Sequence, residues 1–266
     1  MPPAPVFLKL GGSLITDKAT PQTARPAVLA RLANEIAVAV SAAPHQPLLI
    51  GHGSGSFGHV EARKYNTRAG VHTPAEWHGF AQVADVAGRL NRLVVDALRA
   101  AGLPIINISP SAVVTATDGQ ITHMATEPIQ QALAHGLIVV VHGDVAFDTV
   151  RGGTIVSTEE VFNYLANQLH PQRILLAGIE PGVLTKFPGG QLIPTITAAN
   201  IEKLRPGLRG SAATDVTGGM ESKVLTMLAQ VQAQPSLSIR IFSGETPGYV
   251  TAALLNDPHL PGTTLR

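Results

Sequence analysis

The stretch Pro47-Leu48-Leu49-Ile50-Gly51-His52-Gly53-Ser54-Gly55-Ser56-Phe57-Gly58-His59 holds four glycines within eight residues. The apolar run near its start predicts a short buried strand at residues 48–50. The glycines allow the backbone to turn sharply behind this strand and to approach a bound group. Successive N–H groups in such a turn form an anion-binding concavity, above all where a helix follows. The stretch therefore predicts an anion site, with the histidine at its end beside the bound group.

Short β-rich runs alternate with longer helical patterns on both sides of this stretch. The expected strands span residues 6–10, 48–50, 105–108, 137–141, 154–156, 173–177 and 237–242, and the expected helices span 27–41, 78–101, 127–135, 158–169 and 220–233. A hairpin is expected to join the strand at 137–141 to the strand at 154–156. This alternation predicts an α/β fold with a mainly parallel sheet and helices on both faces.

Composition excludes several classes of protein. The chain has 266 residues, 45% apolar and 14% charged, which indicates a well-packed globular domain. The net charge of +1 gives no global field for nucleic acid or for an anionic membrane surface. The absence of cysteine excludes disulfides and thiolate metal sites. We find no signal peptide at the start and no run of about 18 apolar residues, so we expect a cytoplasmic protein.

A second glycine turn, Lys9-Leu10-Gly11-Gly12-Ser13, lies at the end of the first expected strand. Ligands of open α/β sheets bind beyond the carboxyl ends of strands, where this turn falls. Lys9 would supply a charge, and the Gly11 and Gly12 amides would cradle phosphate oxygens. Lys18 offers another cation further along the chain. Taken alone, the turn is more typical of an ordinary strand-to-helix connection with a surface lysine.

A third cluster is Thr214-Asp215-Val216-Thr217-Gly218-Gly219-Met220-Glu221-Ser222-Lys223, in which Gly218 and Gly219 precede the helix expected at 220–233 and Lys223 lies in its first turn. A helix N-terminus beside two glycines and a lysine is typical of a phosphate site, and the glycine-rich residues 207–219 are interpreted as a functional loop. An exposed lysine on a plain helix start is the alternative. Three such loops in one βα protein favour the phosphate interpretation.

Two other interpretations of the first loop compete with a phosphate site. Gly53 to Gly58 matches G-x-G-x-x-G, the dinucleotide fingerprint, but no acidic residue ends a strand about 20 residues further on. His52 and His59 bracket the loop, yet no nearby carboxylate has metal-ligand spacing. We therefore interpret His52 as a buried, hydrogen-bonded structural residue and His59 as the one that contacts a ligand.

Together these motifs resemble the amino-acid kinase superfamily and, within it, the isopentenyl phosphate kinases. The matching pieces are Lys9-Leu10-Gly11-Gly12-Ser13, Thr16-Asp17-Lys18, Gly51 to His59, His142-Gly143-Asp144-Val145 and Asp215-Val216-Thr217-Gly218-Gly219-Met220 with Lys223. The resemblance runs from residue 9 to residue 223 and thus covers nearly the whole chain.

The resemblance implies an open αβα sandwich formed by a single domain, residues 1–266, in a homodimer. It places the acceptor in a lobe of about residues 1–170 and the nucleotide in a lobe of about residues 171–266. The reaction it implies is transfer of the γ-phosphoryl group of ATP, with Mg²⁺, to isopentenyl phosphate. No nucleic acid and no membrane take part.

The resemblance also assigns roles to individual residues. Its catalytic residues are Lys9, Lys18 and His59, of which Lys18 would stabilise the transition state. The acceptor site would comprise Gly53, Gly58, His59 and Thr158. The ATP site would comprise Lys9, Leu10, Gly11, Gly12, Ser13, Ser54, Gly218, Gly219 and Lys223. Direct metal ligands are not assigned.

The chain departs from the family pattern at two places. Ser157-Thr158-Glu159 stands where the family has Ser-Gly-Asp. Glu159 would organise the lysines or Mg²⁺ as the aspartate does, whereas Thr158 adds a side chain where glycine contacts the acceptor. The nucleotide-side segment of the family often reads Thr-Asp-Val-Asp/Glu-Gly-Val, whereas this chain has Gly178-Ile179-Glu180-Pro181-Gly182-Val183, so adenine and ribose contacts through acidic side chains are not carried over.

Two further functions fit parts of the pattern. A fosfomycin kinase-like enzyme for another small phosphate or phosphonate shares the histidine loop, and the pocket beyond His59 would decide between the two. Trp77, Phe80 and Val83 would supply an apolar wall for a prenyl tail, although a helix core uses the same residues. A non-catalytic nucleotide sensor would use the same fold, but it has no need for three lysines at the phosphates.

Overall fold

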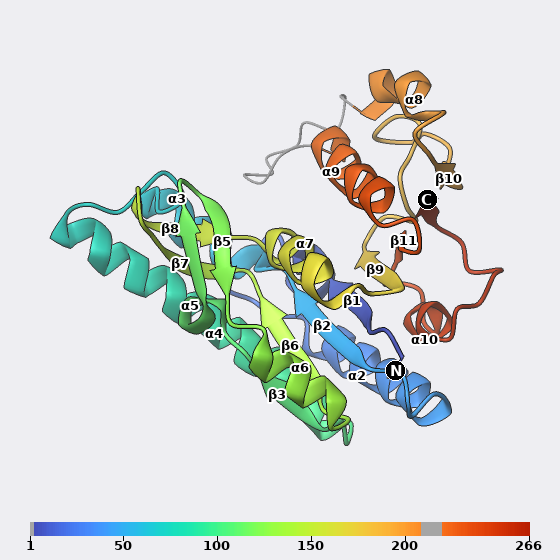
Figure 1. Cartoon of the computed structure of the whole chain (residues 1–266), viewed down its shortest axis with the longest axis horizontal. Helices are drawn as coiled ribbons and strands as arrows, with labels where there is room; N and C mark the ends of the chain where they lie inside the picture. Colours follow the sequence, from blue (N-terminus) through green and yellow to red (C-terminus); the bar gives the residue numbers. More distant parts are fainter. Residues whose placement is uncertain (1–2, 209–219) are drawn as a thin grey trace.

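Strand β1 (Val6–Leu10) lies inside an eight-stranded sheet, because apolar side chains cover both of its faces. The computed structural model describes residues 3–208 and 220–266, without the side chains of residues 59–61, 63 and 220. The sheet order is β10-β12-β11-β9-β1-β2-β6-β3 (Figure 1). The other strands are β2 (Leu48–His52), β3 (Ile105–Asn107), β6 (Ile138–His142), β9 (Arg173–Gly178), β10 (Thr195–Ile196), β11 (Ser238–Ser243) and β12 (Thr263–Leu265). Strands β3, β6, β2, β1, β9 and β11 pair in parallel, which confirms the expected parallel sheet.

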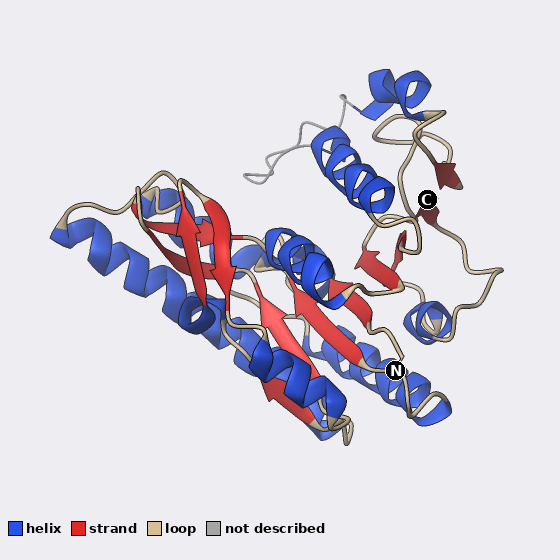
Figure 2. Cartoon of the chain, in the orientation of Figure 1, coloured by secondary structure: helices blue, strands red, loops and turns tan. Residues whose placement is uncertain are grey.

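Helices cover both faces of this sheet (Figure 2). Val6, Leu8 and Leu10 pack in one apolar cluster with α1 (Gly12–Ile15), α2 (Pro26–Ala42), α4 (Pro74–Ala100) and α10 (Tyr249–Leu254). Phe7 belongs to a second cluster with α6 (Glu127–Ala134), α7 (Thr158–Leu169), α8 (Ile201–Leu208) and α9 (Met220–Ala233). Successive residues of a strand point to opposite faces, so one strand serves both clusters. The open αβα sandwich is confirmed.

A second sheet, of four strands, stands apart from the first. Its order is β5 (Gln120–Met124), β4 (Val114–Thr117), β7 (Asp144–Asp148) and β8 (Gly152–Val156). The expected hairpin between the strands at 137–141 and 154–156 is wrong: β8 pairs instead with β7. The reason is that β6 already has β2 and β3 on its two sides, so the chain passes Gly143 and starts a new sheet.

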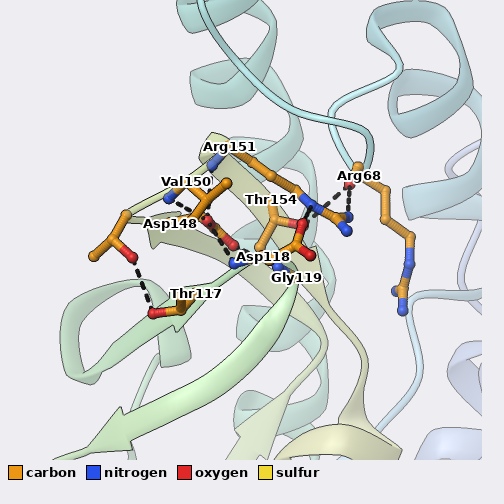
Figure 3. Close-up of polar contacts among 9 residues, drawn as sticks. Arg68, Thr117, Asp118, Gly119, Asp148, Val150, Arg151 and Thr154 are labelled. Atoms are coloured by element: carbon orange, nitrogen blue, oxygen red, sulfur yellow. Dashed lines mark hydrogen bonds and ion pairs between the residues drawn. The ribbon is translucent and has the colours of Figure 1, made fainter.

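The Asp148 carboxylate holds the turns of the second sheet together (Figure 3). Its Oδ1 accepts hydrogen bonds from the N–H groups of Asp118, Val150 and Arg151 at 3.0, 2.8 and 2.8 Å. Its Oδ2 accepts from the Gly119 N–H at 2.7 Å. Burial opposes ionisation of this group, but the four N–H donors outweigh burial and lower the pKa of Asp148. One ionised side chain therefore links the β4–β5 turn to the β7–β8 turn.

The loop that follows α3 (Gly55–Tyr65) is fastened to the same sheet (Figure 3). The carbonyl oxygen of Arg68 accepts from Arg151 Nη1 and from Thr154 Oγ1, each at 3.2 Å. Arg68 Nη2 in turn donates to Glu160 Oε1 at 2.8 Å. The second sheet, the loop after α3 and the start of α7 therefore form one connected unit.

Helix boundaries follow capping chemistry. Helix α4 begins at Pro74, earlier than expected, because Thr73 and Glu76 form a capping box. Helix α7 begins at Thr158 as expected, with Ser157 as its N-cap. The short α5 (Pro110–Val113) was not expected. Of the expected functional loop at residues 207–219, Gly207 lies within α8, and residues 209–219 lie outside the described residues. Among the described helices, none combines the length and the hydropathy required to cross a bilayer; the cytoplasmic location stays a prediction.

Candidate functional site

The two glycine turns predicted from the sequence touch each other. A Cβ atom on Gly12 would lie 2.3 Å from the backbone nitrogen of Gly55, and one on Gly53 would lie 2.8 Å from the nitrogen of Gly12. The Gly53 N–H donates to the carbonyl oxygen of Leu10 at 3.0 Å. Gly55 has φ of +50°, which glycine adopts without strain. The turns after β1 and β2 therefore pack backbone against backbone, which only glycine permits.

The free amides of these turns differ in part from those expected. The Gly11 N–H donates to the carbonyl oxygen of Ala177 at 2.8 Å, so Gly11 serves the sheet and not a ligand. Elsewhere in the turns, four N–H groups have no acceptor among the described residues: those of Gly12, Ser13, Ser54 and Gly55. Gly12, Ser13 and Gly55 belong to the first turns of α1 and α3, where N–H groups lack intrahelical partners, and Ser54 lies directly before α3. Such an arrangement favours anion binding.

Lys9 and Glu159 form an ion pair beside these turns. Lys9 Nζ donates to Glu159 Oε1 at 2.5 Å, and the two side chains are 14% and 31% exposed. Burial raises the pKa of Glu159, but attraction by Lys9 and Lys223 outweighs it and leaves this pKa below its usual value. Lys223 lies in the first turn of α9. One carboxylate therefore interacts with two of the predicted phosphate-binding lysines, and its role as their organiser stays a prediction.

The Thr158 side chain packs against the end of β2, directly before the second glycine turn. Its side chain is 1% exposed, and its Oγ1 donates to the carbonyl oxygen of His52 at 2.6 Å. Its methyl group fills the space beside Gly51, where a Cβ would approach it to 2.6 Å. The methyl and hydroxyl groups that replace the family's glycine are therefore used in packing.

His52 is buried and hydrogen-bonded, as expected. Its Nε2 lies 3.2 Å from Asn91 Oδ1, its Nδ1 lies 3.2 Å from the Gly53 carbonyl oxygen, and its ring stacks on His142 at 5.4 Å between centroids. Burial, with repulsion from His142, lowers the pKa of His52 to about 3, and burial lowers that of His142 to about 4. Both imidazoles are therefore neutral near pH 7, and the single N–H of neutral His52 donates to one of these two oxygens.

Lys18 lies on the exposed loop between α1 and α2. A hollow of about 460 Å³ adjoins it. Ser13 and Lys18 line one part of this hollow, and Ile179, directly after β9, lines another. The hollow therefore lies beyond the carboxyl ends of β1 and β9, where ligands of open α/β sheets bind. Arg25 and Glu245 also line it, and sequence reasoning missed both, because their pairing depends on segments far apart in the chain.

Some of the predicted site residues lie partly or wholly outside the described residues. The His59 backbone belongs to the first half of α3, but its side chain is outside the described residues. Gly218 and Gly219 also lie outside them. Gly58 packs on Ser54, whose Oγ would lie 2.5 Å from a Cβ. In residues 3–208 and 220–266, we find no cluster of three histidine or carboxylate side chains that could hold a metal on its own.

The proposed apolar wall belongs to a small separate core. Phe80 and Val83 are buried with Val71 and Val145 between α4 and the second sheet. Trp77, at the edge of this cluster, packs edge-on against Phe80 with ring centroids 5.2 Å apart. Packing accounts for these side chains, and their contact with a prenyl tail stays a prediction.

A parallel sheet with glycine turns, lysines and free amides at its carboxyl edge is typical of α/β proteins that bind phosphate groups. The chain belongs to the Amino acid kinase family, whose profile matches residues 5–243. It is similar to the isopentenyl phosphate kinase of Methanothermobacter thermautotrophicus, with 34% identity covering 95% of this chain and 96% of that protein. The isopentenyl phosphate kinase of Haloferax volcanii is 36% identical, over 92% of this chain and 97% of that protein.

Solved structures give the same grouping. X-ray structures of isopentenyl phosphate kinase superpose with a TM-score of 0.79 at 28% identity, covering 98% of this chain and 99% of that one. An N-acetylglutamate synthase from Neisseria gonorrhoeae superposes with a TM-score of 0.65 at 15% identity, which shows the shared fold alone. It covers 98% of this chain and 61% of that one.

Proposed function

We propose that this chain is an isopentenyl phosphate kinase, which transfers the γ-phosphoryl group of ATP to isopentenyl phosphate and yields isopentenyl diphosphate and ADP. Its similarity to isopentenyl phosphate kinases over most of its length supports this activity. The observation that carries the chemistry is the contact between the turns after β1 and β2. It brings two sets of free amides together, as a reaction between two phosphate groups requires.

The acceptor chemistry agrees with the charges of the site. An oxygen of the acceptor phosphate attacks the γ-phosphorus, and the bond from that phosphorus to the bridging oxygen of ADP breaks. A phosphate oxygen is already ionised near neutral pH, so the attack needs no general base. Glu159 is ion-paired with Lys9, so this carboxylate is engaged by a lysine and is not a free general base. A hydroxyl acceptor would call for a free carboxylate.

We assign the residues as follows within this proposal. Lys9 and Lys223 neutralise charge on the transferred phosphates, and the amides of Gly12, Ser13, Ser54 and Gly55 orient the oxygens. Lys18 stabilises the charge that develops in the transition state. His59 and Gly58 hold the acceptor phosphate.

Mg²⁺, the homodimer and the two lobes belong to the same proposal. Magnesium, when bound with ATP, would neutralise phosphate charge, and it takes few protein ligands beside phosphate oxygens. The acceptor would occupy the lobe of about residues 1–170 and the nucleotide that of about residues 171–266.

A coupled ADP-release assay tests the proposal. The acceptors are isopentenyl phosphate, dimethylallyl phosphate, fosfomycin, acetylglutamate and UMP, each with Mg-ATP. We expect turnover with isopentenyl phosphate well above the ATPase background. Turnover with fosfomycin alone would favour a fosfomycin kinase-like enzyme, and nucleotide binding without turnover of any acceptor would favour a sensor. Either result would reject the proposal.

A further inference from the structure

The loop of residues 16–25, which carries Lys18, contacts the acceptor-side turn. Thr16 Oγ1 accepts a hydrogen bond from the Ser56 N–H at 3.0 Å, and the Gln22 N–H donates to the Ser56 carbonyl oxygen at 3.2 Å. Within the loop, the Asp17 N–H donates to the carbonyl oxygen of Thr23 at 2.9 Å. One side of the loop is therefore attached to α3, directly after the glycine turn.

The other side of the loop is attached to the nucleotide-side strands by Arg25. Arg25 Nη1 lies 2.5 Å from Glu245 Oε1, and Nη2 lies 3.2 Å from Glu245 Oε2. Arg25 Nη1 also donates to the carbonyl oxygen of Leu14 in α1, at 3.0 Å. Glu245 follows β11, and its own N–H donates to Ser243 Oγ at 3.3 Å. The two-point geometry of an arginine and a carboxylate fixes orientation as well as distance.

The ion pair lies where Lys18 would act. Arg25 and Glu245 line the same hollow as Ser13, Lys18 and Ile179. The hollow is thus lined by the loop of residues 16–25 and by residues that follow β9 and β11, and the Arg25–Glu245 ion pair joins these two parts. We propose that Arg25 and Glu245 are positioning residues that hold the loop of residues 16–25, and with it Lys18, at the phosphoryl-transfer site. The kinetic part of this inference rests on the proposed function.

Because the Arg25–Glu245 ion pair is partly exposed, a positioning role can be distinguished from a contribution to the stability of the fold. The Arg25 and Glu245 side chains are 33% and 37% exposed, and ion pairs exposed to this extent add little to the free energy of folding. A displacement of about 1 Å at a reacting group, by contrast, costs up to about 100-fold in rate. Loss of the pair should therefore reduce turnover without a matching loss of stability.

The kinetic test compares Glu245→Gln and Arg25→Lys with Asp96→Asn, which breaks the exposed Arg92–Asp96 pair on α4. We expect Glu245→Gln to lower kcat about 10- to 100-fold, with the KM for isopentenyl phosphate within about 3-fold and the melting temperature within about 3 °C of wild type. Arg25→Lys keeps the charge but loses the two-point contact, so its kcat should lie between the kcat of wild type and that of Glu245→Gln. Asp96→Asn should match wild type. Unchanged kcat in Glu245→Gln would overturn the inference.

A second measurement does not depend on the acceptor. Hydrogen–deuterium exchange of a peptide covering residues 16–25 is followed in the ligand-free wild type and in Glu245→Gln. We expect exchange in the variant to be at least about 10-fold faster, because the loop loses one attachment. If wild type fails to phosphorylate isopentenyl phosphate but exchange of residues 16–25 is faster in Glu245→Gln, the proposed function alone fails. If wild type is active and exchange is unchanged, the positioning role alone fails.

Discussion

Glu159 Oε1 lies 2.5 Å from Lys9 Nζ, so the first turn of α7 is joined to the central strand β1 at its carboxyl end. Lys9 points to the face of the sheet that α7 covers, and the Ser157 cap starts α7 so that Glu159 lies in its first turn. A lysine restrained in this way presents its charge to a ligand at low entropic cost.

Glu159→Gln should lower kcat/KM for phosphoryl transfer by about 10- to 100-fold, because Lys9 loses its partner and moves from the phosphates. Glu159→Asp keeps the charge of the family's usual residue and should retain more activity. Steady-state kinetics with saturating ATP measure both variants. Glu127→Gln, in the first turn of α6 and exposed, is the control. Wild-type kinetics in Glu159→Gln would reject the organising role.

His59→Ala should raise the KM for isopentenyl phosphate by at least about 10-fold and leave the Kd for ATP within about 3-fold. The reason is that one hydrogen bond to a charged group, worth about 1.5–3 kcal/mol, would be lost on the acceptor side alone. Acceptor kinetics and nucleotide titration measure the two effects, with exposed His123→Ala as control. If binding of ATP weakens as much as binding of isopentenyl phosphate, His59 either contacts the nucleotide or has a structural role.

Part of the site was predictable because its signals are local. Gly12, Gly53 and Gly55 were found from their spacing behind apolar runs, and their close contact explains why the spacing is needed. Which amides remain free was not predictable. The Gly11 N–H is used by Ala177 on β9, and that pairing depends on how distant strands align in the sheet.

Other features of the fold were not predicted from the sequence, among them two strands of the second sheet. Asp118-Gly119 is a hairpin signal and would have located β4 and β5 had it been used. Helix α3 was hidden by Gly55 and Gly58, since glycine is a poor helix former, and tertiary contacts override that preference here. The Arg25–Glu245 pair left no trace in the sequence, because the two residues come from opposite ends of the chain.

Asp148→Asn should lower the free energy of unfolding by about 2–3 kcal/mol. The amide nitrogen that replaces Oδ2 would face the Gly119 N–H, so two donors would meet and a buried N–H would lose its acceptor. Urea denaturation measures the change. Asp118→Asn is the control: its side chain is 70% exposed and pairs with Arg151, so the expected loss is below about 1 kcal/mol. Equal losses in the two variants would reject the special role of Asp148.

The stacked imidazoles of His52 and His142 make stability depend on pH. Both pKa values are lowered from 6.5, to about 3 and about 4, so the folded protein keeps the rings neutral where the unfolded chain takes up protons. The unfolded state then binds more protons between about pH 4 and pH 6.5. The free energy of unfolding from this source is therefore complete above pH 6.5 and falls as the pH falls toward 4.

His142→Phe should flatten this dependence, because phenylalanine keeps the stacking ring and removes one titrating group. Each such group contributes a slope of about 1.4 kcal/mol per pH unit while the unfolded state is protonated and the folded state is not. Urea denaturation at a series of pH values between 4.5 and 6 should therefore give a slope smaller by about this amount, whatever the variant's stability at pH 7. His45→Gln, at an exposed position, controls for the loss of a histidine as such. A slope equal to that of wild type would show that His142 is protonated in the folded protein.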